Sequence, residues 1–260
     1  MNSISTSRAP QVIETKPLVR SIAHRGLHVK AQGRIENTAS AFEAAIAKGY
    51  GIEGDLQPAD GYAPVVFHDD TLGRLTEGNG SVKAMTPAAL GRLAMHGTRD
   101  RILSLQEFLE LVAGRVPLLI EIKSDWQTGD AFAHAIAPVL KRYKGVYGLM
   151  SFDPLRVRPF ADLLPGVPRG IVAGGLRRDR HVMPWIRRWT VPTLWRNDIL
   201  RPDFLAYHVK GLPSAAASLR RRPRGMPLFT WTVRTPADRA KAARYADAMI
   251  FETFEPDPLL

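Results

Sequence analysis

The stretch that decides the fold is GIEGDLQ at residues 51–57, together with the VVFHD that follows at residues 65–69. Both runs are rich in apolar and β-branched residues, which is typical of β-strands. The segment between them, PADG at residues 58–61, contains an Asp-Gly turn signal. We therefore expect a strand followed by a short antiparallel return arm, which would bring His68 back towards Glu53.

Similar runs recur along the chain and alternate with helix-like stretches. The other expected strands are Leu18–Ala23, Leu118–Ile122, Val146–Ser151, Gly170–Val172, Phe204–Tyr207, Leu228–Val233 and Met249–Phe251. The expected helices are Thr38–Lys48, Leu105–Val112, Ala131–Tyr143, Pro154–Leu163, Ser214–Arg222 and Pro236–Tyr245. Alternation of this kind favours a parallel α/β protein. Once the return arm is set aside, the remaining strands match the number in a (β/α)8 TIM barrel.

The length of 260 residues suits one large domain or two small ones, and no interdomain linker is visible. We expect residues 1–17 to form a flexible N-terminus and residues 18–260 to form a single catalytic barrel domain. Residues 71–100 contain several glycines and no strong strand pattern. We interpret the region around residues 70–100 as a small insertion at the barrel mouth.

The composition is that of a globular protein, with 45% apolar and 23% charged residues. The absence of cysteine excludes disulfides and thiolate metal sites, and it favours a reducing compartment. The start of the chain lacks the apolar core of a secretory signal, and no stretch approaches the roughly 20 apolar residues that span a bilayer. We therefore expect a soluble, cytoplasmic protein.

The net charge is +11, and the basic excess is concentrated late in the chain, at residues 177–180, 187–188 and 220–224. Such runs can form a solvated surface, or they can attract anionic lipid or a polyanionic substrate. They lack interleaved aromatic residues and no nucleic-acid-binding motif accompanies them, so we do not expect nucleic acid as a partner. Weak association with an anionic membrane surface remains an expectation.

Three acidic side chains lie in or at the end of apolar runs: Glu53, Asp55 and Glu121. Residues i and i+2 of a strand point to the same side, so Glu53 and Asp55 would repel each other unless a cation lies between them. Hard oxygen ligands favour Mg²⁺ or Ca²⁺ over zinc. Glu121 would lie at the carboxyl end of its strand, where barrel active sites form. The alternative for Glu121 is a salt bridge with Lys123.

His24 and His68 each lie at the end of an expected strand. A single histidine of this kind is usually structural, but two that share a strand end with three acids favour proton transfer near neutral pH. Arg25 can hold phosphate oxygens bidentately, and Gly26 allows a sharp turn after it. The alternative for Arg25 is a surface position on a loop. Acids that bind a metal beside histidines and cations indicate metal-assisted cleavage of a phosphodiester.

These residues belong to a longer series of short motifs with a characteristic order and spacing. The series is His24-Arg25-Gly26, Glu36-Asn37-Thr38 with Ala41-Phe42, Glu53-Gly54-Asp55, Asp60-Gly61, Val65–Asp69, Leu72–Thr76, Glu121-Ile122-Lys123, Ser151-Phe152-Asp153 and Trp231-Thr232-Val233. It resembles the glycerophosphodiester phosphodiesterase family, of the phosphatidylinositol-phospholipase-C-like TIM-barrel superfamily. The resemblance covers roughly residues 20–255.

The resemblance implies metal-dependent hydrolysis of small glycerophosphodiesters to glycerol 3-phosphate and an alcohol, through a cyclic phosphate. The implied site consists of the acid/base pair His24 and His68, the metal ligands Glu53, Asp55 and Glu121, the phosphate contacts Arg25 and Lys123, and Trp231 at the barrel mouth. One divalent cation, Mg²⁺ or Ca²⁺, is the implied cofactor. Which histidine acts as acid and which as base is left open.

The chain departs from the family pattern at three places. It has Pro58-Ala59 where Thr-Lys often precedes the Asp-Gly turn, Arg234 where asparagine commonly follows Trp-Thr-Val, and Phe251-Glu252-Thr253 where the last strand usually ends in Thr-Asp. The first change lies at a turn tip. We expect the other two at the rim of the site, where they would alter substrate preference and not the chemistry.

Two other functions remain open from the sequence. A lysophospholipase D-like phosphodiesterase would use the same residues on lysophospholipids, and a wide apolar groove beside Trp231, Phe152 and Trp195 would favour it. A non-catalytic barrel would bind a phosphorylated ligand or an anionic membrane instead. Metal-dependent turnover would separate the enzymes from the binding protein. The headgroup and the oligomeric state are open in each case.

Overall fold

Parallel strands form a closed barrel in the computed structural model, which describes residues 14–126, 129–174, 201–215, 217–218 and 225–259. The ring closes because β1 pairs with β2 on one side and with β10 on the other. The barrel strands are β1 (Ile22–Ala23), β2 (Gly51–Pro58), β5 (Leu118–Ile122), β6 (Tyr147–Ser151), β7 (Arg169–Ala173), β8 (Phe204–His208), β9 (Leu228–Val233) and β10 (Ala248–Phe251). The TIM-barrel fold expected from the sequence is confirmed.

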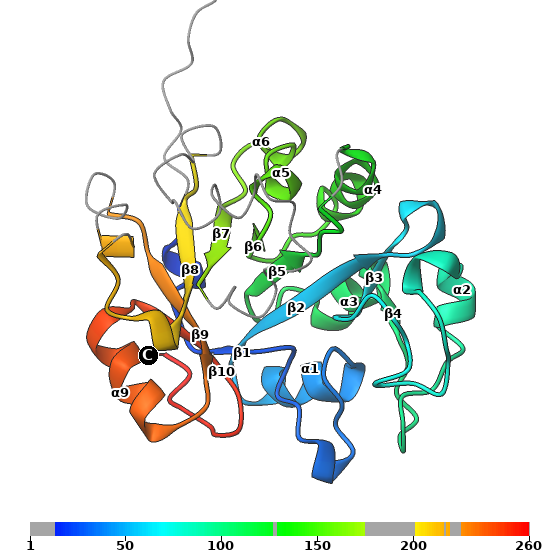
Figure 1. Ribbon diagram of the computed structural model, residues 1–260, viewed down its shortest axis with the longest axis horizontal. Helices are drawn as coiled ribbons and strands as arrows, with labels where there is room; N and C mark the ends of the chain where they lie inside the picture. The colour runs from blue at the N-terminus through cyan, green and yellow to red at the C-terminus, as the bar shows by residue number, and fades with distance from the viewer. Residues whose placement is uncertain (1–13, 127–128, 175–200, 216, 219–224, 260) are drawn as a thin grey trace, which may run out of the picture.

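The helices lie outside the barrel strands, as Figure 1 shows. Those described in full are α1 (Ala39–Ala47), α2 (Pro87–Leu90), α3 (Leu105–Val112), α4 (Ala131–Leu140), α5 (Pro154–Val157), α6 (Phe160–Leu163) and α9 (Pro236–Tyr245). The sequence predicted one helix over Pro154–Leu163, but two short helices occupy this range. Pro159 precedes the second helix, and its nitrogen has no hydrogen to donate, which interrupts the helical ladder. The helix expected over Ser214–Arg222 lies partly outside the described residues.

Two helices begin at capping boxes, which satisfy N–H groups that a helix start leaves without partners. At the start of α3, the Glu107 N–H donates to Ser104 Oγ at 3.2 Å and the Ser104 N–H donates to Glu107 Oε2 at 2.8 Å. Thr235 and Asp238 form the same arrangement at α9. The second box holds the loop between β9 and α9 at the carboxyl end of the barrel, and this loop carries Arg234.

The barrel interior is filled by apolar side chains towards the amino ends of the strands. They form one buried cluster of Leu18, Ile22, Leu119, Met150, Val172, Phe204, Ala206, Phe229, Ala248 and Ile250. A larger cluster lies between the strands and the helices, where the rings of Phe42 and Phe108 are 4.4 Å apart. A barrel filled in this way is a packed core and not a pore, so a ligand can enter only at its end.

Two short strands extend the sheet antiparallel from the end of β2: β3 (Pro64–Val66) and β4 (Leu103–Ser104). β3 is the expected return arm, whereas β4 was not predicted because two residues are too short a run to recognise. The residues between β3 and β4 pack on an apolar cluster of their own, which includes Phe67, Leu72 and Leu90. Figure 1 shows this part beside the barrel, at the end of β2.

The N-terminal segment expected to be flexible lies mostly outside the described residues. Its last part enters a 3₁₀ turn, η1 (Lys16–Leu18), in which Leu18 is buried against the barrel interior. The division of the chain into domains stays a prediction. None of the described helices combines the length and the apolar character that a bilayer crossing needs.

Candidate active site

The predicted site residues converge at the carboxyl ends of the barrel strands, around a cavity of about 220 Å³. Seven of them line it: His24, Arg25, Glu53, His68, Glu121, Lys123 and Trp231. Asp55, the eighth, is buried and lies in ion-pair contact with both Arg25 and Lys123. Segments that are far apart in the sequence therefore supply one site.

The loop after β1 is held tightly against α1. Arg25 (φ 55°) and Gly26 (φ 79°) both have left-handed backbone conformations. A Cβ at Gly26 would lie 2.8 Å from the carbonyl carbon of Ala41, so only glycine fits against this helix. The turn aims the Arg25 N–H at Glu53, and it donates to Glu53 Oε2 at 3.0 Å. The loop after β1 is thereby attached to the carboxylates on β2.

Glu53 and Asp55 project from β2 and Glu121 from β5, and all three are buried. The strand register places Asp55 beside Glu121, and one oxygen of each acid lies within 4.8 Å of the other two. Glu53 Oε1 has no hydrogen-bond partner among the described residues. Burial raises the pKa of Glu53 well above its usual value, and the charges of Asp55 and Glu121 raise it further. A divalent cation would supply the missing partner and relieve the repulsion, so the donor set fits Mg²⁺ or Ca²⁺.

Two partly buried cations lie beside these acids. Lys123 Nζ lies 2.7 Å from Asp55 Oδ1 and 2.6 Å from Glu121 Oε1, so the salt bridge considered as the alternative for Glu121 is present. The Arg25 guanidinium lies 3.3 Å from Asp55 Oδ2 and 2.6 Å from Glu36 Oε1. Burial opposes both charges, but the neighbouring acids hold the pKa values of Arg25 and Lys123 above their usual range. Both side chains therefore stay charged and are held where a phosphate would meet them.

The two histidines have different surroundings. His24 is buried, its Nδ1 pairs with Glu252 Oε1, and its Nε2 lies 3.8 Å from Glu53 Oε2. Burial lowers the pKa of His24 to about 4 and outweighs the opposing hydrogen bond with Glu252. The His68 side chain is 31% exposed, and its Nδ1 lies 2.6 Å from Asp69 Oδ1. Each ring thus has one nitrogen paired with an acid, which leaves the other for proton transfer.

Sequence reasoning missed the contact between Glu252 and His24. The departure at residues 251–253 was expected to affect substrate preference only, but Glu252 contacts His24 directly and is held in turn by Arg234 Nε at 2.6 Å. The hydrogen bonds from His24 and His28 and nearby positive charges lower the pKa of Glu252, although burial alone would raise it. The signal was available, because Glu252 directly follows an apolar strand, as Glu121 ends one.

In the sequence, Asn37 stands out only as part of a short motif. In the structure it is fully buried behind Asp55. Its Nδ2 donates to Asp55 Oδ2 at 2.8 Å, and its Oδ1 accepts from the Asp55 N–H at 3.2 Å. The side chain therefore fixes the orientation of a predicted metal ligand. No periodicity marks this residue, since it lies in a loop with a left-handed backbone (φ 58°).

We expect Asn37→Ala to weaken divalent-cation binding by about 10–100-fold, because partners that orient a ligand are worth that much in metal affinity. Calorimetric titration with Mg²⁺ and Ca²⁺ measures the effect. Asn79→Ala, at an exposed position of the insertion, is the matched control. Unchanged affinity in Asn37→Ala with an intact fold would show that Asn37 does not orient the ligand.

Aromatic side chains form the wall of the cavity opposite β2. The Trp231 ring meets Phe152 and His208 edge-on, with ring centroids 5.2 Å and 4.8 Å apart. Trp231 Nε1 donates to the Ala206 carbonyl oxygen at 3.2 Å, which fixes the indole. Trp195, the third aromatic residue expected at a groove, lies outside the described residues.

Comparisons with known proteins agree on one family. The model of the "Glycerophosphoryl diester phosphodiesterase family" matches residues 24–174, which hold every predicted site residue except Trp231. The chain is 32% identical over 164 residues to glycerophosphodiester phosphodiesterase 1 of Rattus norvegicus, covering 58% of this chain and 48% of that one. It thus spans about half the length of this relative.

Two bacterial proteins match nearly the whole chain. A glycerophosphodiester phosphodiesterase of Caldanaerobacter subterraneus subsp. tengcongensis is 29% identical over 252 residues, covering 92% of this chain and 95% of its own. The structure of a phosphodiesterase from Oleispira antarctica, in complex with the product sn-glycerol-3-phosphate, is 22% identical with a TM-score of 0.71. The match covers 89% of this chain and 92% of that one. At this sequence identity, the similarity of the two structures shows the fold alone.

Proposed function

This chain belongs to the glycerophosphoryl diester phosphodiesterase family, and we propose that it hydrolyses glycerophosphodiesters to glycerol 3-phosphate and an alcohol. The observation that carries the proposal is the convergence of two acid-paired histidines on three buried carboxylates and two partly buried cations. The Oleispira antarctica relative, whose structure holds sn-glycerol-3-phosphate, supports the same product here.

We propose that Glu53, Asp55 and Glu121 hold one divalent cation, Mg²⁺ or Ca²⁺. When bound, this ion would withdraw charge from the phosphate and lower the pKa of a coordinated hydroxyl. Arg25 and Lys123 would bind the remaining phosphate oxygens, where the negative charge of the transition state is concentrated. Trp231 would cover the glycerol carbons and exclude water from that side of the cavity.

The histidines would carry the protons in two steps. In the first, His24 Nε2 removes the proton of the glycerol 2-hydroxyl, whose oxygen bonds to phosphorus. The bond to the alcohol oxygen breaks, and His68 protonates that oxygen. In the second step water opens the cyclic phosphate, with both proton transfers reversed. Burial lowers the pKa of His24, so this ring is neutral, and with Nδ1 donating to Glu252 it accepts at Nε2, which supports its assignment as the base.

The cyclic route makes the glycerol 2-hydroxyl indispensable. A 2-deoxy substrate analogue should therefore not be hydrolysed above background, while it still competes with the normal substrate for binding. Release of the alcohol from both compounds, followed by chromatography, measures the difference. Normal hydrolysis of the 2-deoxy analogue would mean that water attacks phosphorus directly.

Hydrolysis itself is tested with purified protein and four substrates: glycerophosphocholine, glycerophosphoethanolamine, glycerophosphoglycerol and lysophosphatidylcholine. The last compound addresses the lysophospholipid alternative, for which Phe152 and Trp231 form a shared aromatic wall. Preference for lysophosphatidylcholine over glycerophosphocholine would favour that alternative. Absence of turnover with all four compounds, at saturating Mg²⁺ or Ca²⁺, would contradict the proposed enzyme class. The cytoplasmic location stays a prediction.

The basic runs at residues 177–180, 187–188 and 220–224 lie outside the described residues. We propose that they attract anionic surfaces and take no part in the chemistry. Replacing Arg220, Arg221 and Arg222 together by glutamine should weaken binding to vesicles of anionic lipid and make it less sensitive to salt. Turnover of a small glycerophosphodiester should change little. A large loss of that turnover, with intact circular dichroism, would place these arginines in the site.

A further inference from the structure

One arginine of the insertion, Arg74, contacts two acids that pair with candidate site residues. Its Nε donates to Asp69 Oδ2, and its Nη2 donates to Asp69 Oδ1 at 3.0 Å. On the other side, Nη1 donates to Glu36 Oε2 at 3.0 Å and Nη2 donates to Glu36 Oε1 at 2.7 Å. The guanidinium therefore holds both carboxylates bidentately, a geometry that adds direction to the attraction between the charges.

The same two acids pair with residues that are proposed to take part in the reaction. Asp69 Oδ1 lies 2.6 Å from His68 Nδ1, and Glu36 Oε1 accepts from Arg25 Nη1 at 2.6 Å. Burial would raise the pKa of Glu36, but the hydrogen bond from Arg74 and the charges of Arg25 and Arg74 lower it to about 2. Burial would also raise the pKa of Asp69, but hydrogen bonds from His68 and Arg74 lower it. Both acids therefore stay ionised near neutral pH, and Arg74 links the surroundings of His68 to those of Arg25.

The backbone that presents Arg74 is fixed by buried residues on both sides of it. Leu72 and Leu75 belong to the apolar cluster of the insertion, and Thr76 is buried as well. The Thr76 N–H and the Thr76 hydroxyl both donate to the Leu72 carbonyl oxygen at 3.1 Å, which closes the turn. Isolated ion pairs of a half-exposed side chain contribute little, but this side chain has a rigid base and two bidentate partners.

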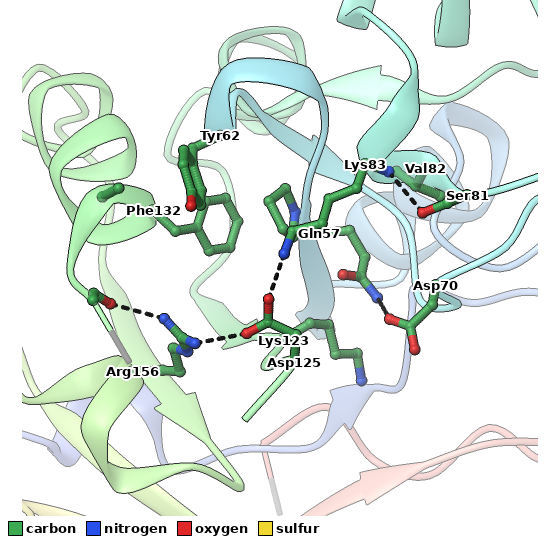
Figure 2. Close-up of a pocket in the computed structure, with 13 residues that line it drawn as sticks. Gln57, Tyr62, Asp70, Ser81, Val82, Lys83, Lys123, Asp125, Phe132 and Arg156 are labelled. Atoms are coloured by element: carbon green, nitrogen blue, oxygen red, sulfur yellow. Dashed lines mark hydrogen bonds and ion pairs between the residues drawn. The ribbon is translucent and has the colours of Figure 1, made fainter. Parts of the chain in front are cut away.

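The backbone of His68 is held separately, from the side of the barrel. The Gln57 amide nitrogen donates to the His68 carbonyl oxygen at 3.0 Å and to Asp70 Oδ1 at 3.1 Å. Figure 2 shows Gln57 and Asp70 in contact at the wall of a neighbouring cavity. Among the described residues, the hydrogen bond with Asp69 is the one that orients the His68 ring. The direction of the ring therefore depends on how firmly the Asp69 carboxylate is held.

We propose that Arg74 is a positioning residue for the reaction: it holds Asp69 so that the His68 ring keeps Nε2 directed at the leaving oxygen. The inference rests on the proposed function, in which His68 protonates that oxygen. Glu36 is the second anchor, and through it the same guanidinium is tied to Arg25. A misplacement of about 1 Å can cost about 10²-fold in rate, so an anchor outside the catalytic cavity can affect the chemistry.

A leaving group that needs no proton distinguishes this role from a general effect on the fold. Two esters of sn-glycerol 3-phosphate are compared: the choline ester and the p-nitrophenyl ester, whose phenol is acidic enough to depart as an anion. In single-turnover experiments with excess enzyme and saturating metal, release of the alcohol measures the first step. Arg74→Gln should slow the choline ester by about 10–100-fold and the p-nitrophenyl ester by less than about threefold, because only the choline ester needs the acid.

Two further variants and a matched control test the same point. Arg74→Lys keeps the charge but loses the bidentate geometry, so it should show the same difference between the esters. The double variant Arg74→Gln/Asp69→Asn should be no worse than Asp69→Asn alone, because the two residues act as a unit. Lys83→Gln, which breaks an ion pair between the insertion and Asp125, should leave both rates unchanged. Equal losses with both esters in Arg74→Gln, or the same losses in Lys83→Gln, would give Arg74 a purely structural role.

NMR spectra of the histidine rings in EDTA test the positioning without turnover. Ring-nitrogen chemical shifts distinguish a neutral ring that carries its proton on Nδ1 from one that carries it on Nε2. The His68 signals, assigned by their loss in His68→Ala, should show the proton on Nδ1 in the parent protein and a mixture of both forms in Arg74→Gln. An unchanged ring in Arg74→Gln would overturn the positioning role. The expected change, without hydrolysis of either ester by the parent protein when Mg²⁺ or Ca²⁺ is added, would support the positioning and contradict the proposed function alone.

Discussion

His24→Ala and His68→Ala should each reduce kcat by at least about 10²–10⁴-fold, the usual contribution of general acid or base catalysis. Each histidine is proposed to transfer a proton in both steps, so the loss of either one disables the whole cycle. The double variant should be little worse than the single ones, because residues that act as a unit are not additive. Steady-state hydrolysis of a glycerophosphodiester at saturating metal measures all three.

His134→Ala, at an exposed position of α4, is the matched control and should retain the activity of the parent protein. Metal affinity should change little in the two single variants, since neither histidine is a proposed ligand. Near-normal kcat in either single variant would show that this histidine is structural. The proposed mechanism with two proton-transferring histidines would then be wrong.

Removal of the metal should abolish hydrolysis, and Mg²⁺ or Ca²⁺ should restore it. The reason is electrostatic, because burial and two neighbouring acids already raise the pKa of Glu53. Without a cation these carboxylates cannot all be ionised at low cost. EDTA treatment with elemental analysis, followed by activity at increasing metal concentration, measures the dependence. Thermal unfolding should also shift upwards with added metal, since an ion that binds only the folded state stabilises it.

The variant Glu53→Gln distinguishes a residue that binds the metal from a residue that transfers a proton. Its loss of activity should be partly rescued by raised metal concentration, whereas the histidine variants should not respond. Glu43→Gln, on the surface of α1, is the control for the same chemical change. Full activity in EDTA, in protein shown to be metal-free, would disprove the proposed cation site.

Much of the fold was predictable because the barrel strands are buried and leave a clear pattern in the sequence. The strand over Leu118–Ile122 and the helix over Leu105–Val112 were predicted to the residue. Failures occurred where the pattern is weak. β4 has two residues, and the helix expected over Pro154–Leu163 is divided at Pro159. Local hydrophobic periodicity carries no information on such short elements.

The convergence of the candidate site residues was predictable where charges interrupt apolar strands, as at Glu53 and Glu121. Asn37 and Glu252 escaped because their importance comes from the partners that the fold brings to them. Asn37 holds Asp55 from a loop, and Glu252 meets His24 across the closure of the barrel. The local sequence marks Glu252 only as a charge after an apolar strand, and its contact with His24 depends on the closed ring.

The pairing of β1 with β10 also has a consequence for synthesis of the protein. His24 and Glu252 are separated by 228 positions, so their contact forms only after nearly the whole chain has been made. At about 5–20 residues per second, a ribosome needs on the order of 10–45 seconds to cover that distance. During this interval β1 has β2 on one side and no partner on the other. The nascent chain is thus an open sheet with an unpaired edge at β1, and the contact between His24 and Glu252 forms only after β10 has been made.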